Sequence, residues 1–109
     1  MHKHDSLQGS LDLLVLKVLS RNPRLHGYAI TTAIQARSAE VLRVEEGSLY
    51  PALHRMEEAG WIRAHWITKD NGRRVRLYEL TAVGTKQLDD EETRWHALTA
   101  AVNCVLRTV

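Results

Sequence analysis

The 109-residue chain has one cysteine, Cys104, so no intrachain disulfide can form. It has no phenylalanine, and three tryptophans and three tyrosines supply its aromatic bulk. No apolar run approaches the roughly 20 residues that cross a bilayer, and residues 1–5 do not lead into the apolar block of a signal peptide. These absences argue against a disulfide-stapled module and a membrane protein, and they predict a cytoplasmic protein.

The signatures of catalysis are also missing. The chain shows no nucleophile motif, no phosphate-binding glycine loop and no paired carboxylates. Its six histidines have no metal-ligand spacing, and the acidic run at residues 89–92 is typical of a solvated helix face. A redox role for Cys104 would need a neighbour that the sequence does not supply. We therefore expect no enzyme activity, no catalytic residue, no metal and no cofactor.

Net charge is small, at +2, but it is unevenly distributed. Residues 1–60 carry seven basic and seven acidic side chains, whereas residues 61–80 carry five basic and two acidic ones, a net charge of +3. Residues 81–109 have a net charge of −1. Such a concentration of positive charge indicates a local anion-binding patch.

Residues 6–20 have the apolar periodicity of a helix, with Asp5 or Ser6 as its N-cap. The apolar arc is wide, so this helix either lies centrally in the core or also contacts a second subunit. Under the second alternative Leu7 and Leu11 are contact residues. A second, weaker helix is expected at residues 26–38, where Gly27 indicates a tight turn or a close approach to a neighbouring helix. The β-prone residues 41–44 predict a short strand.

The stretch 47–61 predicts a third helix, with a buried stripe at Leu49, Ala52, Leu53 and Met56. Proline is tolerated in the first turn, so the helix should begin between residues 46 and 50; Gly60 should end it in a left-handed conformation. An ordinary surface helix is one interpretation. The other is a DNA-reading helix, whose leading polar residues reach the bases. The candidate contacts on its outer side are Ser48, Tyr50, Pro51, His54 and Arg55.

Residues 61–80 read as a two-stranded hairpin around the turn signal Asn71-Gly72. Its tip holds Lys69, Arg73 and Arg74 beside Asn71, where they can reach a phosphate backbone. The tryptophans of this segment, Trp61 and Trp66, are expected to pack within the hairpin.

The last segment, from Thr81, predicts a long helix with a seven-residue apolar repeat. One row contains Leu88, Trp95, Val102 and Val109, and a second row contains Leu98 and Val105. This seam favours a homodimer, with Leu88, Trp95, Leu98, Val102 and Val105 as contact residues. The alternative is that the helix folds back on its own core.

Together these elements predict a mainly α fold with a small antiparallel hairpin, a winged helix-turn-helix followed by a long helix. The expected division is a DNA-binding domain at residues 1–80 and a dimerisation helix at residues 81–109. A winged-helix module that binds proteins and not DNA is the alternative function.

Five motifs give the chain a resemblance to the PadR family of bacterial transcriptional regulators, and they span nearly all of it. They are residues 7–16, residues 26–28, residues 47–57 with 60–62, residues 71–74, and residues 78–81 with Gly84. The single C-terminal helix resembles that of the family's small-subunit branch. The resemblance implies a homodimeric repressor that binds a palindromic operator in double-stranded DNA, and in many members release by a small aromatic or drug-like effector.

The resemblance also assigns roles to residues. It implies a recognition-helix face at Ser48, Tyr50 and His54, a wing at Lys69, Arg73 and Arg74, and an effector contact at Trp95, which also lies in the dimer seam. The chain departs from the family pattern at Glu45 and Glu46, because polar neutral residues are more usual before the recognition helix. These carboxylates suit the helix dipole but repel phosphate.

Overall fold

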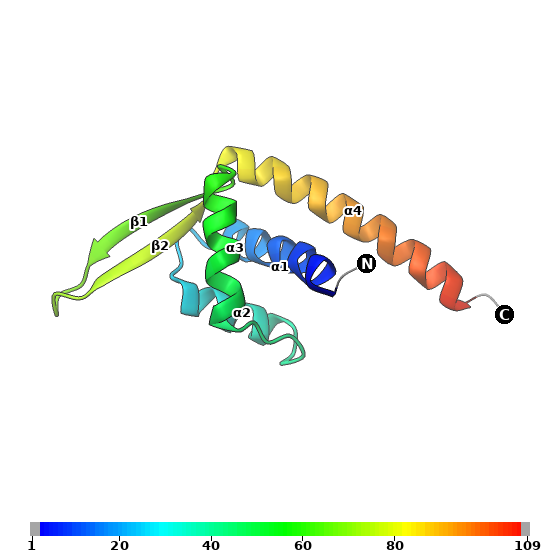
Figure 1. The fold of residues 1–109 in the computed structure, drawn as a ribbon, viewed down its shortest axis with the longest axis horizontal. Helices are drawn as coiled ribbons and strands as arrows, with labels where there is room; N and C mark the ends of the chain where they lie inside the picture. The colour runs from blue at the N-terminus through cyan, green and yellow to red at the C-terminus, as the bar shows by residue number, and fades with distance from the viewer. Residues whose placement is uncertain (1–2, 108–109) are drawn as a thin grey trace.

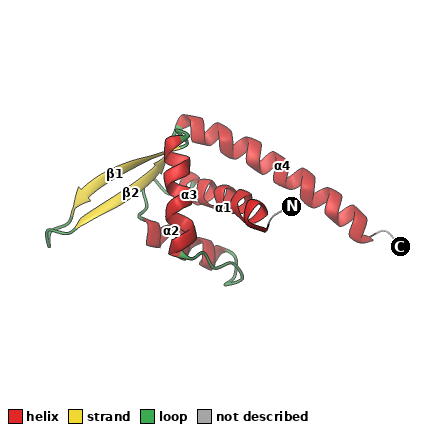
Figure 2. Cartoon of the chain, in the orientation of Figure 1, coloured by secondary structure: helices red, strands yellow, loops and turns green. Residues whose placement is uncertain are grey.

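The computed structural model describes residues 3–107, and the side chains from residue 10 onward. Within this range the predicted fold class is confirmed: four helices and one two-stranded antiparallel sheet (Figure 2). In chain order the elements are α1 (Lys3–Ser20), α2 (Gly27–Arg37), α3 (Glu46–Glu58), β1 (Ile62–Thr68), β2 (Arg74–Leu80) and α4 (Ala82–Arg107). Helices α1, α2 and α3 form a central cluster, from which the hairpin and α4 project in opposite directions (Figure 1). The molecule is therefore elongated, with extents of 61 × 29 × 25 Å.

The core lies where the three central helices meet the base of the hairpin. The predicted stripe of α3 is buried in it, and the wide apolar arc of α1 contributes Val15 and Leu16, both fully buried. Truncating a side chain such as Leu16 or Leu53 to alanine typically costs about 2–5 kcal/mol. The core residues are Leu11, Val15, Leu16, Val18, Leu19, Ile30, Ile34, Leu49, Ala52, Leu53, Met56, Ile62, Tyr78 and Leu88.

Helix α1 begins earlier than its sequence pattern predicts. Its first residue is Lys3, so neither Asp5 nor Ser6 can be its N-cap, and that prediction is wrong. Helix α2 is capped by His26, whose Nδ1 accepts a hydrogen bond from the Ala29 N–H at 3.2 Å. The close approach predicted at Gly27 is confirmed, because a Cβ there would lie 2.5 Å from the hydroxyl oxygen of Tyr50 in α3.

Helix α3 begins at Glu46, at the early edge of the predicted range. The predicted start is therefore confirmed, and Pro51 is the sixth residue of the helix, beyond the first turn in which proline is best tolerated. Because proline has no N–H, the carbonyl of Gly47 has no helical partner; Gly47 is exposed, so water can take that hydrogen bond. The predicted end is confirmed: Gly60 has a φ of +81°, and the Trp61 N–H donates to the Met56 carbonyl at 3.0 Å.

The predicted hairpin is confirmed, with Ile62 opposite Leu80 and Thr68 opposite Arg74. Its turn is five residues long. The Lys69 N–H donates to the Arg73 carbonyl and the Gly72 N–H to the Lys69 carbonyl, both at 2.8 Å. Gly72 has a φ of +83°, the left-handed conformation that the Asn-Gly signal anticipates.

The strand predicted at residues 41–44 is wrong, since this segment has no regular structure. The partner of the hairpin is Leu25, which exchanges two backbone hydrogen bonds with Tyr78, at 3.1 and 2.8 Å. The chain reverses after α2 through Ala39 and Glu40, whose φ angles are positive. The β-propensity of residues 41–44 is therefore overridden, because no strand edge lies beside them.

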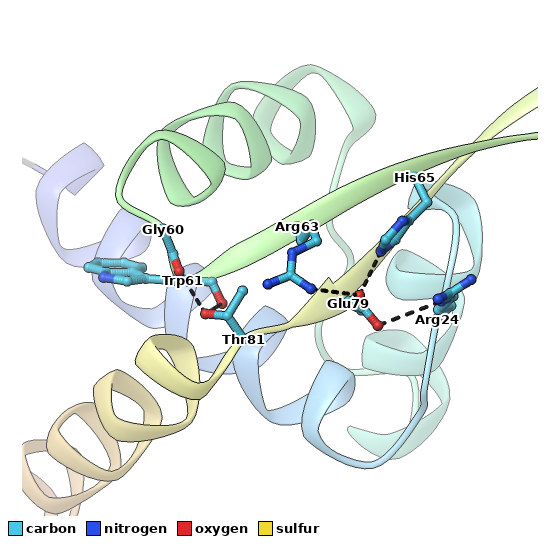
Figure 3. Close-up of polar contacts among 7 residues, drawn as sticks. All are labelled: Arg24, Gly60, Trp61, Arg63, His65, Glu79 and Thr81. Atoms are coloured by element: carbon cyan, nitrogen blue, oxygen red, sulfur yellow. Dashed lines mark hydrogen bonds and ion pairs between the residues drawn. The ribbon is translucent and has the colours of Figure 1, made fainter.

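Helix α4 follows the predicted N-cap, Thr81, whose hydroxyl oxygen accepts the Gly84 N–H at 3.0 Å. The same hydroxyl lies 2.6 Å from the Gly60 carbonyl oxygen and joins the helix to the end of α3 (Figure 3).

Leu11 and Leu88 are both buried in the chain's own core. The prediction of these two residues as dimer contacts is therefore wrong, because the core of the same chain already covers both side chains. The side chain of Leu7 and the residue Val109 lie outside the described parts.

Candidate nucleic-acid interface

A groove of about 700 Å³ lies between α3 and the hairpin. We call it the helix–hairpin groove. Three parts of the chain form it: the start of α2, the outer side of α3, and one face of the hairpin with its tip. Its lining residues are His26, Gly27, Tyr28, Glu46, Tyr50, Trp66, Lys69, Arg73, Arg74, Val75, Arg76 and Tyr78.

Tyr50 and Glu46 are the residues of α3 that line this groove. Its neighbours Leu49 and Leu53 are buried, whereas Tyr50 itself is 45% exposed. Its hydroxyl lies against Gly27, where no side chain competes for space. The exposure predicted for Tyr50 from the apolar stripe is therefore confirmed.

The cations of the hairpin tip reach the same groove. Lys69, Arg73 and Arg74 all line it and are exposed. Between residues 10 and 107, none of the three forms an ion pair with a carboxylate. Asn71 is also exposed, and its Oδ1 accepts the Arg73 N–H at 3.0 Å, which stabilises the turn. The tip therefore presents positive charge that is not neutralised within the described chain.

Other predicted contacts on α3 lie outside this groove. Ser48 is exposed in the first turn but lines a different pocket, and Pro51 is exposed beside Tyr50. The side chain of His54 is 71% exposed and lies 3.4 Å from the carboxylate of Glu58. Thus the groove brings together Tyr50 with the cations of the tip, while the other residues extend the outer side of the helix.

The structure corrects the position of Arg55. Its guanidinium turns inward and makes two hydrogen bonds of 2.8 Å to the two carboxylate oxygens of Asp12 in α1. Asp12 is buried, with 6% of its surface exposed. The hydrogen bond to Asp12 raises the pKa of Arg55. Arg55 therefore joins α3 to α1, and both of its terminal nitrogens already donate hydrogen bonds to Asp12.

A second charged cluster braces the base of the hairpin on its other face (Figure 3). The carboxylate of Glu79 lies 2.6 Å from Nε2 of His65, 3.5 Å from Arg63 and 3.6 Å from Arg24. The hydrogen bond with His65 is the main cause that lowers the pKa of Glu79, and the two arginines add to it. This cluster fixes the loop before α2 against the hairpin.

The groove also contains aromatic and charged residues that sequence reasoning missed. Trp66 was expected to pack within the hairpin, yet it is 55% exposed, and the guanidinium of Arg74 lies 4.6 Å from its ring centre. Arg76 and Tyr28 line the groove as well. The antiparallel register offers a signal that could have found Trp66 and Arg76, because residues opposite each other share one face of a hairpin.

A second pocket, of about 390 Å³, lies between α1, the segment before α3, and α4. We call it the α1–α4 pocket. Leucines of α1 form its apolar side, and Trp95 of α4 closes it. Glu45 and Ser48 also line it, so it adjoins the start of α3.

None of the described helices combines the length and the hydropathy that a bilayer span requires. No group of three histidine, cysteine, aspartate or glutamate side chains is arranged to hold a metal ion within the part of the chain that the structure describes.

Three packed helices, a two-stranded hairpin and a cationic groove between α3 and that hairpin define a winged helix-turn-helix protein. The model of the PadR-like transcriptional regulator family matches residues 15–90. The chain belongs to this family, as its sequence motifs predict.

Solved structures agree with this assignment. A transcriptional regulator from Clostridium thermocellum superposes with a TM-score of 0.82 at 25% identity, covering 91% of this chain and 95% of that one. A PadR family regulator from Eggerthella lenta gives 0.81 at 28% identity, covering 95% and 88%. A PadR-like regulator from Bacillus cereus gives 0.79 at 27% identity, covering 96% and 99%. An uncharacterised protein of Lysinibacillus sphaericus is 26% identical over 95 residues.

Proposed function

We propose that the chain is a homodimeric transcriptional repressor that binds a palindromic operator in double-stranded DNA. One observation carries this proposal: unneutralised cations of the hairpin tip share a groove with the exposed Tyr50 of α3. A helix fits the major groove of B-DNA, and a basic hairpin beside it can reach the flanking phosphates. A repressor of this kind acts on the chromosome, so we expect it in the cytoplasm.

The proposal gives the two parts of the interface different tasks. Tyr50 contacts base edges or the sugars beside them, and Ser48, Pro51 and His54 extend the same outer side of α3. Lys69, Arg73 and Arg74 contact phosphates, with Asn71 holding the turn in shape. Phosphate contacts supply affinity and register, whereas base contacts supply sequence preference.

Binding to labelled DNA from the chain's own upstream region tests the proposal. Arg73→Ala with Arg74→Ala should weaken binding to operator and random duplex alike, and should reduce the slope of log K against log salt by about 2, because each phosphate contact contributes about 0.9. Lys86→Ala, an exposed lysine of α4, is the matched control and should bind as wild type does. Absence of binding at low salt would contradict the proposal and favour the protein-interaction module.

Tyr50 has a separate test on the same two duplexes. Tyr50→Ala should weaken binding to the operator by about tenfold, the order expected for one lost base contact, and should change binding to random DNA little. Equal losses on both duplexes would show that Tyr50 does not read sequence.

A second copy of the chain is the proposed partner of α4. Trp95, Leu98, Val102 and Val105 are 44–72% exposed and recur at intervals of three and four residues along its second half. A long exposed apolar row is costly in water and marks an interface. Two copies joined along this row would present two α3 helices, as a palindrome requires.

Sedimentation measures the dimer directly. Val102→Glu should give monomers and abolish binding to the palindrome. Val83→Glu is the control, because Val83 is also exposed on α4 but lies off the row. A Val102→Glu protein that stays dimeric would contradict the proposed interface.

The α1–α4 pocket is the proposed effector site, with Trp95 as a ligand contact. Its apolar lining and its half-exposed indole suit a flat aromatic molecule. Titration of aromatic or cationic drugs should quench tryptophan fluorescence and release DNA. Trp95→Ala should remove the quenching, while Trp61→Phe should preserve it. Quenching that survives in Trp95→Ala would exclude Trp95 from the site.

A further inference from the structure

Four side chains form a continuous array across the helix–hairpin groove, from the end of α3 to the hairpin tip. Glu57, in the last turn of α3, accepts hydrogen bonds from Nη2 of Arg76 at 2.8 and 3.0 Å. The Arg76 guanidinium lies over the ring of Trp66, 5.5 Å from its centre. The Arg74 guanidinium lies over the same ring at 4.6 Å. The order is therefore Glu57, Arg76, Trp66 and Arg74.

The register of the hairpin explains why these side chains meet. Trp66 is paired directly with Arg76, and Thr68 with Arg74, so Arg74 is a diagonal neighbour of Trp66 on the same face. An arginine over an indole is attracted by the negative face of the ring. Two arginines therefore hold one indole at a fixed position in the strand.

The two arginines differ in their other partners. Arg76 is held by Glu57 and also lies over the ring of Tyr78, which is buried in the core. The Nε atom of Arg76 is buried and has no hydrogen-bond partner among the described residues. Arg74, in contrast, is exposed and has no carboxylate partner in that part of the chain. The array thus runs from Arg76, which is paired with Glu57 of α3, to Arg74, which contacts Trp66 and has no carboxylate partner among the described residues.

The geometry points to a role for Trp66 as a positioning residue in DNA binding, which rests on the proposed function. Trp66 holds the guanidinium of Arg74 at a fixed distance from α3, so that α3 and the wing meet the duplex in one register. Without the indole, Arg74 would sample many rotamers, and ordering it on a phosphate would cost conformational entropy. The exposure of Trp66 supports this role, because a buried indole could not contact a cation at the surface.

Salt-dependent binding to operator DNA tests the inference with four variants and a control. Trp66→Ala should lower affinity about as much as Arg74→Ala, roughly five- to tenfold, and both should reduce the salt slope by about the 0.9 of one phosphate contact. The double variant should be no weaker than either single one. Trp66→Phe keeps an aromatic face and should restore most of the loss. Ile67→Ala, the next residue on the opposite face of β1, should bind as wild type does.

A readout without DNA accompanies these measurements. In a protein whose Trp61 and Trp95 are replaced by phenylalanine, Arg74→Ala should raise the quenching of Trp66 by acrylamide, because a covering cation has been removed. Wild-type binding by Trp66→Ala, or losses that multiply in the double variant, would overturn the inference while the proposed function stands. Failure of the wild type to bind any duplex would overturn the proposed function and this inference with it.

Discussion

The arginine at the contact of α1 and α3 and the arginines at the hairpin tip have opposite surroundings. Arg55 makes two hydrogen bonds to the buried carboxylate of Asp12. Arg73 and Arg74 are exposed, and neither has a carboxylate partner among the described residues. Arginine therefore has two roles in this molecule: Arg55 joins two helices through Asp12, and Arg73 and Arg74 offer positive charge at the surface. The presence or absence of a carboxylate partner distinguishes the two roles. The charge of Arg55 is neutralised by Asp12, whereas the charge at the tip remains available for an anion.

This comparison separates stability from binding. A buried carboxylate that loses its partner carries a large desolvation penalty, whereas an exposed cation without a partner costs little to remove. Substitutions at Arg55 should therefore act on the free energy of unfolding, and those at Arg73 and Arg74 on the affinity for DNA.

The largest effect is expected from Arg55→Met. This change leaves the buried Asp12 carboxylate without its two donors, and it should lower the free energy of unfolding by about 2–4 kcal/mol. That range is below the usual 3–5 kcal/mol for a broken buried pair, because the side chain of Arg55 is 39% exposed and the site is partly solvated. Urea denaturation at fixed protein concentration measures the change.

Asp12→Asn is the informative comparison for Arg55→Met. It removes the buried charge and leaves the more exposed partner, so it should cost less, about 1–2 kcal/mol. Arg37→Met, on the exposed end of α2, controls for the loss of an arginine. If Arg55→Met left stability unchanged and instead weakened DNA binding, the assignment of Arg55 to the interior would fail.

A smaller effect is expected at the start of α3, where Glu46 brings negative charge into the helix–hairpin groove. Glu46→Gln removes repulsion of phosphate and should raise DNA affinity about two- to fivefold at low salt, with the gain vanishing at high salt. It should also lower stability by about 0.3–1 kcal/mol, because a carboxylate in the first turn favours the helix dipole. Fluorescence anisotropy and urea denaturation measure the two changes.

Asp89→Asn, at an exposed position on α4, controls for Glu46→Gln. Asp89 does not line the groove, and α4 is not part of the proposed DNA contact. Affinity that rises equally in both variants would indicate a general effect of net charge and would remove Glu46 from the interface.

Local pattern was sufficient to predict most elements of this fold. The stripe of α3, the left-handed Gly60 and the Asn-Gly turn each depend on neighbouring residues, and all three were confirmed. The strand predicted at residues 41–44 was wrong, because β-propensity does not indicate whether another strand is near enough to pair with. The prediction for Leu88 was wrong because a seven-residue repeat does not show which partner covers it, and here the core of the same chain does so.

The candidate site was harder to predict for the same physical reason. Helical spacing put Arg55 with the outer residues of α3, but its partner Asp12 lies 43 positions away in the sequence. Trp66 looked like a packing residue, because an isolated strand does not reveal that two arginines will share its face. The sequence predicted which segment concentrates positive charge. Only the folded structure showed which of the charged side chains are paired with a carboxylate and which are not.

The smallest effect concerns the paired charges at the base of the hairpin. The pKa of Glu79 is lowered from its ordinary value, chiefly by its hydrogen bond with His65. The ionised carboxylate therefore stabilises the fold fully above the ordinary pKa, and this stabilisation is lost as the pH falls through the lower, folded-state value. Glu79→Gln should flatten the decline in the free energy of unfolding between about pH 5 and pH 3, measured by urea denaturation across that range. Asp90→Asn, an exposed position on α4, should leave the decline as steep as in the wild type. An unchanged decline in Glu79→Gln would mean that the paired charges brace the hairpin no better than solvent does, and the contrast with the unpaired tip would then rest on the Asp12–Arg55 contact alone.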